Sequence, residues 1–179
     1  MKILGIDTST NFLSIGIYGN NKVYEYNLEL GRRHSTLLIP TIKRIVEALG
    51  WNIREIDYFA CGQGPGSFTG IRVGMATIKG LAWSLNKPVV GISTLDILAK
   101  NVNITDRMII PVIDAKRGLV YCSIYKIKDG IQKRIAPYML LTEDDFFRKV
   151  NPSAEILGVK PGDECDAASG GNPDFGRGV

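Results

Sequence analysis

A glycine-rich stretch, residues 62–74, is the feature that most constrains how this chain can fold. An apolar run at residues 58–61 precedes it, and a helix-like pattern over residues 71–85 follows it. Glycines and a proline packed so closely indicate a tightly bent backbone with little side-chain bulk. A strand that leads through such a turn into a helix leaves free N–H groups at the helix start, where an anion or a partner can bind. The stretch therefore predicts a binding loop.

The known phosphate-binding loops do not fit this stretch. A Walker A loop has Lys followed by Ser or Thr directly after its last glycine, whereas Ile71-Arg72 follow Gly70 here. A Rossmann turn has glycines at its first, third and sixth positions. Counted from Gly64, the sixth position is Thr69, and the glycine comes one residue late. The loop is therefore of another kind.

Several motifs follow one another along the chain in an order that is typical of one family. They are Gly5-Ile6-Asp7-Thr8-Ser9, His34-Ser35, Gly64-Pro65-Gly66-Ser67-Phe68-Thr69-Gly70-Ile71-Arg72-Val73-Gly74, Gly91-Ile92-Ser93-Thr94-Leu95-Asp96 and Asp114-Ala115-Lys116-Arg117-Gly118-Leu119-Val120-Tyr121. Together they resemble the TsaB (YeaZ) family of bacterial tRNA threonylcarbamoyladenosine synthesis, in the glycoprotease-like (peptidase M22-like) superfamily. Lys116 stands where the family has arginine. The resemblance covers residues 1–150.

The composition is that of an ordinary globular protein, with 45% hydrophobic and 22% charged residues among 179. This length holds one sizeable domain or two small lobes. No apolar run is long enough to span a membrane, and Asp7 comes too early for a signal peptide, so we expect a cytoplasmic protein. Cysteines at 61, 122 and 165 without CxxC spacing fit a reducing compartment. A net charge of +4 is compatible with an RNA partner but does not require one, since paired basic residues usually form solvated surface.

The order of apolar runs predicts an α/β fold. Strands are expected at 2–7, 11–18, 22–30, 58–61, 89–92, 108–114 and 133–141, and helices at 35–49, 71–85, 94–100 and 143–150. The first three strands are joined by turn residues and should form an antiparallel meander, and a βαβα arrangement should follow. Pro40 is expected to kink or delay the first helix, and Gly50 to end it.

The second half of the chain begins like the first. A constant offset of 107 places Ile6-Asp7 on Ile113-Asp114 and Ile17-Tyr18 on Ile124-Tyr125. This internal duplication predicts two ribonuclease-H-like lobes of the actin-like ATPase (sugar kinase/heat-shock/actin) architecture, which the family resemblance also implies. We expect a first lobe at 1–104, a short second lobe at 105–150, and an irregular Gly/Pro-rich tail at 151–179. That tail is a loop, a diverged end or a truncation.

Two aspartates occupy the positions that hold a metal-bound phosphate in ATPases of this architecture. Asp7 is followed by Thr8 and Ser9, and Asp114 is its counterpart in the second lobe. These four residues form a candidate nucleotide cleft, although Asp, Thr and Ser are also ordinary turn formers at strand ends. Since no lysine or glutamine is placed as a hydrolytic base, we do not expect the chain to hydrolyse ATP efficiently by itself.

His34 is the only histidine, which excludes a metalloprotease of the His-Glu-x-x-His kind. A nucleophile elbow is also missing, because Ser67 lies in Gly-Ser-Phe-Thr-Gly rather than Gly-x-Ser-x-Gly. The related catalytic subunit, TsaD, carries a His-x-x-x-His metal pair, and the matching positions here are Thr94 and Leu98. We therefore expect neither catalytic residues nor a metal site, and a capping or partner-contact role for His34.

Small residues recur every four positions in the helix predicted at 71–85, as in Ala76, Gly80 and Ser84. Such a narrow face allows close approach, either to the chain's own sheet or to a partner helix. The resemblance implies that the first-lobe helices pair with a second copy or with TsaD. The expected interface residues are His34, Leu38, Ile42, Arg72, Met75, Ala76, Lys79 and Gly80.

The resemblance implies a non-catalytic accessory subunit for threonylcarbamoyl modification of tRNA adenosine 37. Its partners would be a TsaD-like catalytic subunit and a TsaE-like ATPase, with a homodimer in isolation and indirect contact with tRNA. It implies no tightly bound cofactor, with ATP or ADP at a partner interface. The alternatives are an actin-like ATPase or glycoprotease-type peptidase that acts alone, and a scaffold for unrelated partners.

Overall fold

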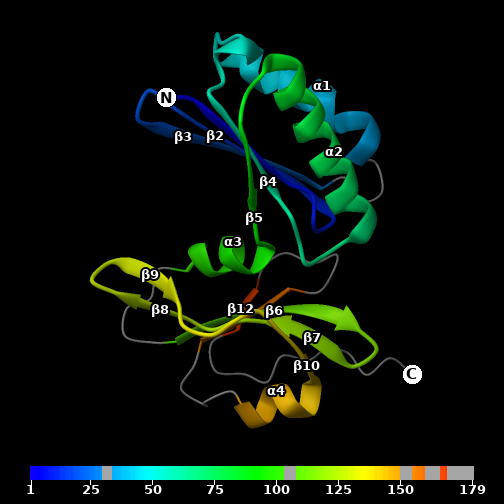
Figure 1. Cartoon of the computed structure of the whole chain (residues 1–179), viewed down its shortest axis with the longest axis vertical. Coiled ribbons are helices and arrows are strands. Elements are labelled where there is room, and N and C mark those ends of the chain that lie inside the picture. The colour runs from blue at the N-terminus through cyan, green and yellow to red at the C-terminus, as the bar shows by residue number, and fades with distance from the viewer. Residues whose placement is uncertain (30–33, 103–107, 150–154, 160–165, 169–179) are drawn as a thin grey trace. The chain divides into compact units, whose positions relative to one another are not determined.

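The computed structural model describes residues 1–29, 34–102, 108–149, 155–159 and 166–168, in two compact units, Met1–Thr94 and Leu95–Val179 (Figure 1). The division falls before the boundary after residue 104 that the sequence suggested. The reason is helix α3 (Thr94–Lys100), whose Leu95 and Leu98 pack with Ile113 of the second unit. Each unit is built around its own sheet.

The first unit contains a five-stranded sheet in the order β3-β2-β1-β4-β5. Its strands are β1 (Ile3–Asp7), β2 (Phe12–Gly19), β3 (Lys22–Glu29), β4 (Tyr58–Gly62) and β5 (Val89–Ile92). Strands β1 to β3 are antiparallel neighbours, whereas β4 runs parallel to β1 and β5 parallel to β4. The predicted meander and the βαβ arrangement that follows it are confirmed.

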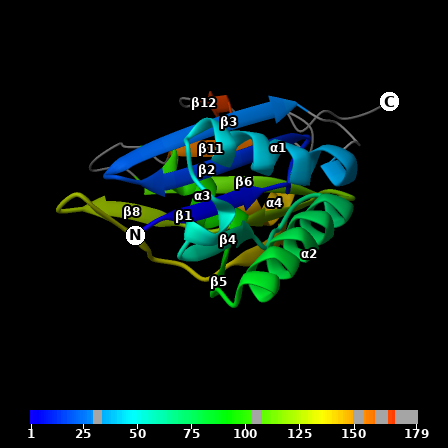
Figure 2. The ribbon, with the colours of Figure 1, turned by 90° about the horizontal axis from the view of Figure 1, so that it is seen from above.

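Helices α1 (His34–Ala48) and α2 (Phe68–Leu85) pack beside each other on one face of this sheet (Figures 1 and 2). Alternate apolar side chains of the strands meet the apolar faces of the two helices, as alternation on a half-covered sheet predicts. The buried core residues include Leu4, Ile6, Leu13, Ile15, Ile17, Leu38, Ile42, Val46, Phe59, Ile78 and Ala82. Helix α1 continues through Pro40, and Gly50, with φ of +70°, follows its end as expected.

The second unit repeats the strand order of the first. Its elements are β6 (Met108–Lys116), β7 (Leu119–Cys122), β8 (Tyr125–Lys128), β9 (Ile131–Arg134), β10 (Met139–Thr142), α4 (Glu143–Lys149), β11 (Glu155–Val159) and β12 (Asp166–Ala168). The order β10-β7-β6-β11-β12 matches β3-β2-β1-β4-β5, because β6 has an antiparallel neighbour in β7 and a parallel one in β11. The duplication seen in the sequence is therefore a duplication of topology. The outer strand differs, since β12 is antiparallel to β11.

The tail at 151–179 is not wholly irregular, contrary to the expectation. Strand β11 lies within it and pairs along its whole length with β6, from Glu155 opposite Ile109 to Val159 opposite Ile113. The apolar run in β11 is short and stands between Pro152 and Pro161, so local pattern alone did not reveal it. The other tail residues, apart from β12, lie outside the described part. The single strand predicted at 133–141 is two strands, β9 and β10.

Candidate functional site

The glycines of the loop predicted to bind a ligand face the chain itself. Gly62, Gly66, Gly70 and Gly74 all lie against the turn at residues 7–9, directly after β1. A Cβ atom added to any of the four would lie 2.0–2.5 Å from an atom of that turn. Real Cβ atoms do not approach other atoms so closely, so the glycines are needed for the loop and α2 to rest directly on the turn.

Hydrogen bonds hold the loop on this turn. The Thr8 hydroxyl donates to the Gly70 carbonyl at 2.8 Å, and the Ser67 amide donates to the Ser9 carbonyl at 2.6 Å. The Ser67 hydroxyl in turn accepts from the Gly70 amide at 3.2 Å and caps α2. Thr8 and Ser9 are each only 2% exposed. The loop and turn therefore form an interlock that fixes the position of α2 on the sheet.

The two aspartates of the candidate nucleotide cleft make equivalent contacts, each within its own unit. One oxygen of Asp7 accepts from the Ser9 amide at 2.6 Å and from the Ser9 hydroxyl at 2.5 Å. One oxygen of Asp114 accepts from the Lys116 amide at 2.6 Å, and the Lys116 ammonium lies 2.8 Å from the other oxygen. Residues 7 and 9 correspond to residues 114 and 116 at the offset of 107. The duplication therefore extends from the strands to the hydrogen bond between the aspartate carboxylate and the amide two residues later. Each aspartate thus accepts a hydrogen bond from the amide two residues later and closes the turn that follows it.

The face of α2 opposite the interlock is exposed. Of the expected interface residues, Arg72, Ala76, Lys79 and Gly80 are exposed, whereas Met75 is half-buried against the core. Two exposed aromatic side chains on this helix were not among the expected interface residues: Phe68, which the sequence analysis placed only in the glycine-rich motif, and Trp83, which it did not single out. Trp83 is 89% exposed and Phe68 is 74% exposed, with the Arg72 guanidinium 5.2 Å from the Phe68 ring. Helical spacing would have identified them, because residues 68, 72, 76, 79 and 83 follow one another on the face opposite Gly70 and Gly74.

The expected contribution of α1 to this surface needs correction. Leu38 and Ile42 are 1% and 2% exposed and belong to the core of the first unit, because the apolar face of α1 packs on its own sheet. The exposed apolar residue of α1 is Ile39, at 55%. His34 begins the helix, but its side chain lies outside the described residues. We call the exposed residues Ile39, Phe68, Arg72, Ala76, Lys79, Gly80 and Trp83 the α1/α2 face.

A groove of about 280 Å³ opens beside α1. It is lined by Ile39, Ile42, Lys43, Val46, Glu47, Trp51, Asn52, Ile53 and Leu81. Its walls are mainly apolar, with one exposed ion pair at the rim, where Lys43 and Glu47 are 3.8 Å apart. Such a groove adjoining an exposed apolar surface is typical of an interaction site.

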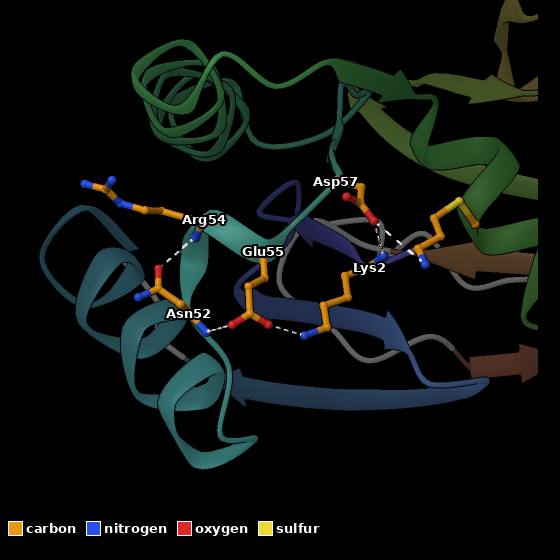
Figure 3. Close-up of polar contacts among 6 residues, drawn as sticks. Lys2, Asn52, Arg54, Glu55 and Asp57 are labelled. Carbon is orange, nitrogen blue, oxygen red and sulfur yellow. Dashed lines mark hydrogen bonds and ion pairs between the residues drawn. The ribbon is translucent and has the colours of Figure 1, made fainter.

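One wall of the groove is held by a polar cluster around the short helix η1 (Ile53–Glu55) (Figure 3). The Lys2 ammonium donates to the Glu55 carboxylate and lies 4.1 Å from the centre of the Trp51 ring. Glu55 also accepts from the Asn52 amide, and the Lys2 amide donates to Asp57 at 2.7 Å. The hydrogen bonds from Lys2 and Asn52 lower the pKa of Glu55. This cluster ties the Trp51–Asn52 wall to β1.

Two cysteine thiols, those of Cys61 and Cys122, are buried in the cores of the two units. Burial raises the pKa of Cys61 and raises that of Cys122 to about 11, so both thiols stay protonated at neutral pH. Within the described residues, no three His, Cys, Asp or Glu side chains gather as metal ligands would. Those residues likewise include no helix with the length and apolarity to cross a membrane.

Comparison with known proteins places these features in one group. A family model described as "TsaD: tRNA N6-adenosine threonylcarbamoyltransferase" matches residues 28–151. The tRNA threonylcarbamoyladenosine biosynthesis protein TsaB of Bacillus subtilis is 36% identical over 76% of this chain and 60% of its own length. Escherichia coli TsaB is 34% identical over 70% of this chain and 55% of its own. The chain thus spans somewhat more than half the length of these relatives.

Solved structures agree with the sequence comparison. YeaZ from Pseudomonas aeruginosa superposes with a TM-score of 0.77 at 27% identity, over 88% of this chain and 74% of that protein. A second Pseudomonas aeruginosa structure, described as similar to the peptidase YeaZ, gives a TM-score of 0.79 at 26% identity with the same coverage. The actin-like, glycoprotease-type α/β fold expected from the sequence is confirmed.

Proposed function

The chain belongs to the TsaD family on its TsaB (YeaZ) branch, and we propose that it is a non-catalytic accessory subunit in threonylcarbamoyl modification of tRNA adenosine 37. In this role it pairs with a TsaD-like catalytic subunit through the α1/α2 face, and with a second copy when that subunit is absent. A TsaE-like ATPase completes the assembly, which acts in the cytoplasm, and tRNA is brought to the chain by these partners.

The observation that carries this proposal is the exposure of Trp83 on α2. A tryptophan that is 89% exposed leaves a large apolar surface in water, and covering it in an interface is favourable. Beside it, Ala76 and Gly80 offer no side chain beyond Cβ, and an added Cβ at Gly80 meets no atom within 4 Å. A partner helix can therefore approach the α2 backbone closely and cover the Trp83 and Phe68 rings.

An accessory role is supported by the residues that stand, in this chain, where the family resemblance places phosphate-binding and metal-binding residues. The Asp7 carboxylate accepts two hydrogen bonds from Ser9 within its own turn. The family resemblance assigns the positions of the TsaD histidine pair to Thr94 and Leu98, and the Leu98 side chain, 6% exposed, packs with Leu95 and Ile113. An aliphatic side chain cannot ligate a metal. ATP or ADP would accordingly bind where the chain meets its partner rather than on this chain alone.

The test is association with a purified TsaD-like protein, measured by size-exclusion chromatography with light scattering. Trp83→Glu places a charge on the most exposed aromatic residue of the α1/α2 face and should abolish co-elution and threonylcarbamoyl transfer. Val23→Glu is the matched control, since Val23 on β3 is also apolar and 64% exposed but lies off this face. Undiminished association of the Trp83→Glu variant would contradict the proposal. Hydrolysis of ATP or peptides by the chain alone, lost in Asp7→Ala, would favour the enzyme alternative.

A further inference from the structure

We propose that the β8–β9 hairpin of the second unit binds the phosphate backbone of a double-stranded RNA segment through Lys126, Lys128 and Lys133. The proposal rests on the proposed function, which brings tRNA to the assembly, and it adds a direct contact between RNA and this chain. The three residues lie on one face of the hairpin, which we call the lysine face.

The strand register places these ammonium groups together. Lys126 of β8 is directly opposite Lys133 of β9, and Lys128 is opposite Ile131. Directly opposed residues share a face, as do residues two apart on a strand, so all three lysines project from the same side. Each of them is exposed. At about 3.4 Å per residue, Lys126 and Lys128 are spaced by about 6.8 Å along the strand.

Within the part of the chain that the structure describes, no ion pair neutralises the lysine face. Among residues 108–149, all of which the structure describes, the ion pairs involve Lys116, Arg134 and Arg148, and none involves the three lysines. Asp129, at the turn, is the only acidic residue between Tyr125 and Arg134. Like charges directly opposite each other destabilise a strand pair, and an anion that bridges Lys126 and Lys133 removes that cost.

The hairpin is held in place from its other face, so the lysines are presented in a fixed arrangement. Tyr125 and Ile127 are 3% and 6% exposed and pack with Ala99 and Ile109. The Arg134 guanidinium lies 3.8 Å from an Asp96 oxygen and 4.0 Å from the centre of the Tyr138 ring.

The turn adds to this rigidity. Asp129 and Gly130 both have positive φ, at +55° and +71°, which is the type I′ geometry that joins two strands tightly. Figure 1 shows the resulting two-stranded ribbon at one end of the second sheet.

The composition of this face selects the kind of anion. Among the described residues it carries no aromatic side chain, and its apolar neighbours are Ile131 opposite Lys128 and Met108 of β6 opposite Lys126, so it offers no aromatic platform on which unpaired bases stack. Recognition of double-stranded RNA depends instead on shape and on phosphate and sugar contacts. Three ammonium groups on a rigid ribbon suit a backbone whose charges recur regularly.

The experiment measures binding of a fluorescent tRNA transcript and of a 20-base-pair RNA duplex to the chain alone, by anisotropy from 50 to 200 mM salt. Lys126→Glu/Lys128→Glu/Lys133→Glu should weaken binding of both RNAs at least tenfold at 50 mM. It should also make the slope of log K against log salt shallower by about one for each lost phosphate contact. Lys22→Glu/Lys87→Glu/Lys149→Glu carries the same change in net charge on other surfaces and should retain most of the affinity.

Three results would overturn the proposal: an unchanged affinity and slope in the hairpin variant, an equal loss in the control variant, or lysine-dependent binding of poly-glutamate as tight as that of the duplex. The last would identify the face as a site for an acidic protein. Circular dichroism melting checks that both variants fold, and Lys133→Glu alone, which opposes unlike charges across the strands, provides a second folded variant. Because no TsaD-like protein is present, failure here leaves pairing through the α1/α2 face standing, and failure of that pairing leaves RNA binding unaffected.

Discussion

Thr8 and Gly70 lie in direct contact although 62 positions separate them in sequence, with the Thr8 hydroxyl donating to the Gly70 carbonyl at 2.8 Å. An added Cβ on Gly70 would lie 2.0 Å from the Thr8 carbonyl oxygen. The contact joins the first β-turn of the chain to the first turn of α2. Glycine inside a helix ordinarily lowers stability. Here Gly70 is needed because only a residue without a side chain lets the helix backbone approach Thr8 so closely. The α1/α2 face is therefore positioned by the turn after β1.

The first prediction compares two glycines of α2. Gly70→Ala should lower the free energy of unfolding by about 1–3 kcal/mol, because the new methyl group meets backbone atoms that cannot move aside cheaply. Gly80→Ala should raise it by about 0.5–1 kcal/mol, since Gly80 is exposed and nothing lies within 4 Å of its added Cβ. Urea denaturation followed by circular dichroism measures both. If the Gly70→Ala variant is as stable as the wild type, the Thr8 turn and α2 can move apart to admit a methyl group at little cost, contrary to this prediction.

The fold could be predicted largely from local pattern and internal repetition. Alternation of apolar residues identified the meander, and the offset of 107 identified two lobes whose strand orders prove to match. The role of the glycine loop could not be deduced in this way. The sequence shows the glycines but not that Gly70 lies against Thr8, because that contact joins distant parts of the chain. Strand β11 was missed for a related reason, because its partner β6 lies far away in sequence.

Of the residues expected at an interface, Arg72, Ala76, Lys79 and Gly80 are exposed. Leu38 and Ile42 were expected there but are buried, because the apolar face of a helix covers the core before it is available to a partner. Trp83 was passed over because large aromatic residues normally lie at least partly buried.

A second prediction concerns Asp96, which fastens α3 to the second sheet. The hydroxyls of Tyr125 and Tyr138 each donate to its carboxylate at 2.6 Å. Asp96→Ala should lower the free energy of unfolding by about 1.5–3 kcal/mol. The substitution removes a charged acceptor, and the hydroxyl of the buried Tyr125 loses its hydrogen bond to the Asp96 carboxylate. Tyr138→Phe is the control: Tyr138 is 47% exposed, and its loss should cost less than about 1 kcal/mol. Equal effects in thermal melts would contradict this assignment.

A third prediction concerns pH. The pKa of Glu55 is lowered from 4.5, first by the hydrogen bond from Lys2. A group with a lowered folded pKa contributes stability above its unfolded pKa and loses that contribution as the pH falls through the folded value. Glu55→Gln should therefore melt below the wild type at pH 7, and the difference should shrink as the pH falls from about 5 through the lowered pKa. Glu25→Gln on β3 is matched in charge and exposure. A difference that persists at the acidic end would show that Glu55 acts other than through its charge.

A fourth prediction concerns the buried thiols. Burial raises the pKa of Cys122 to about 11, and the Cys61 thiol is shifted in the same direction for the same reason. Since the thiolate is the reactive form, only about one thousandth of Cys122 is reactive at pH 8, and the surrounding core also excludes reagents. In a Cys165→Ser background, iodoacetamide at pH 8 should modify neither residue in the folded chain within an hour and both within minutes in 6 M urea, as mass spectrometry would show. Prompt modification of Cys122 under native conditions would mean that β7 opens readily, and that the second unit is less securely packed than the first.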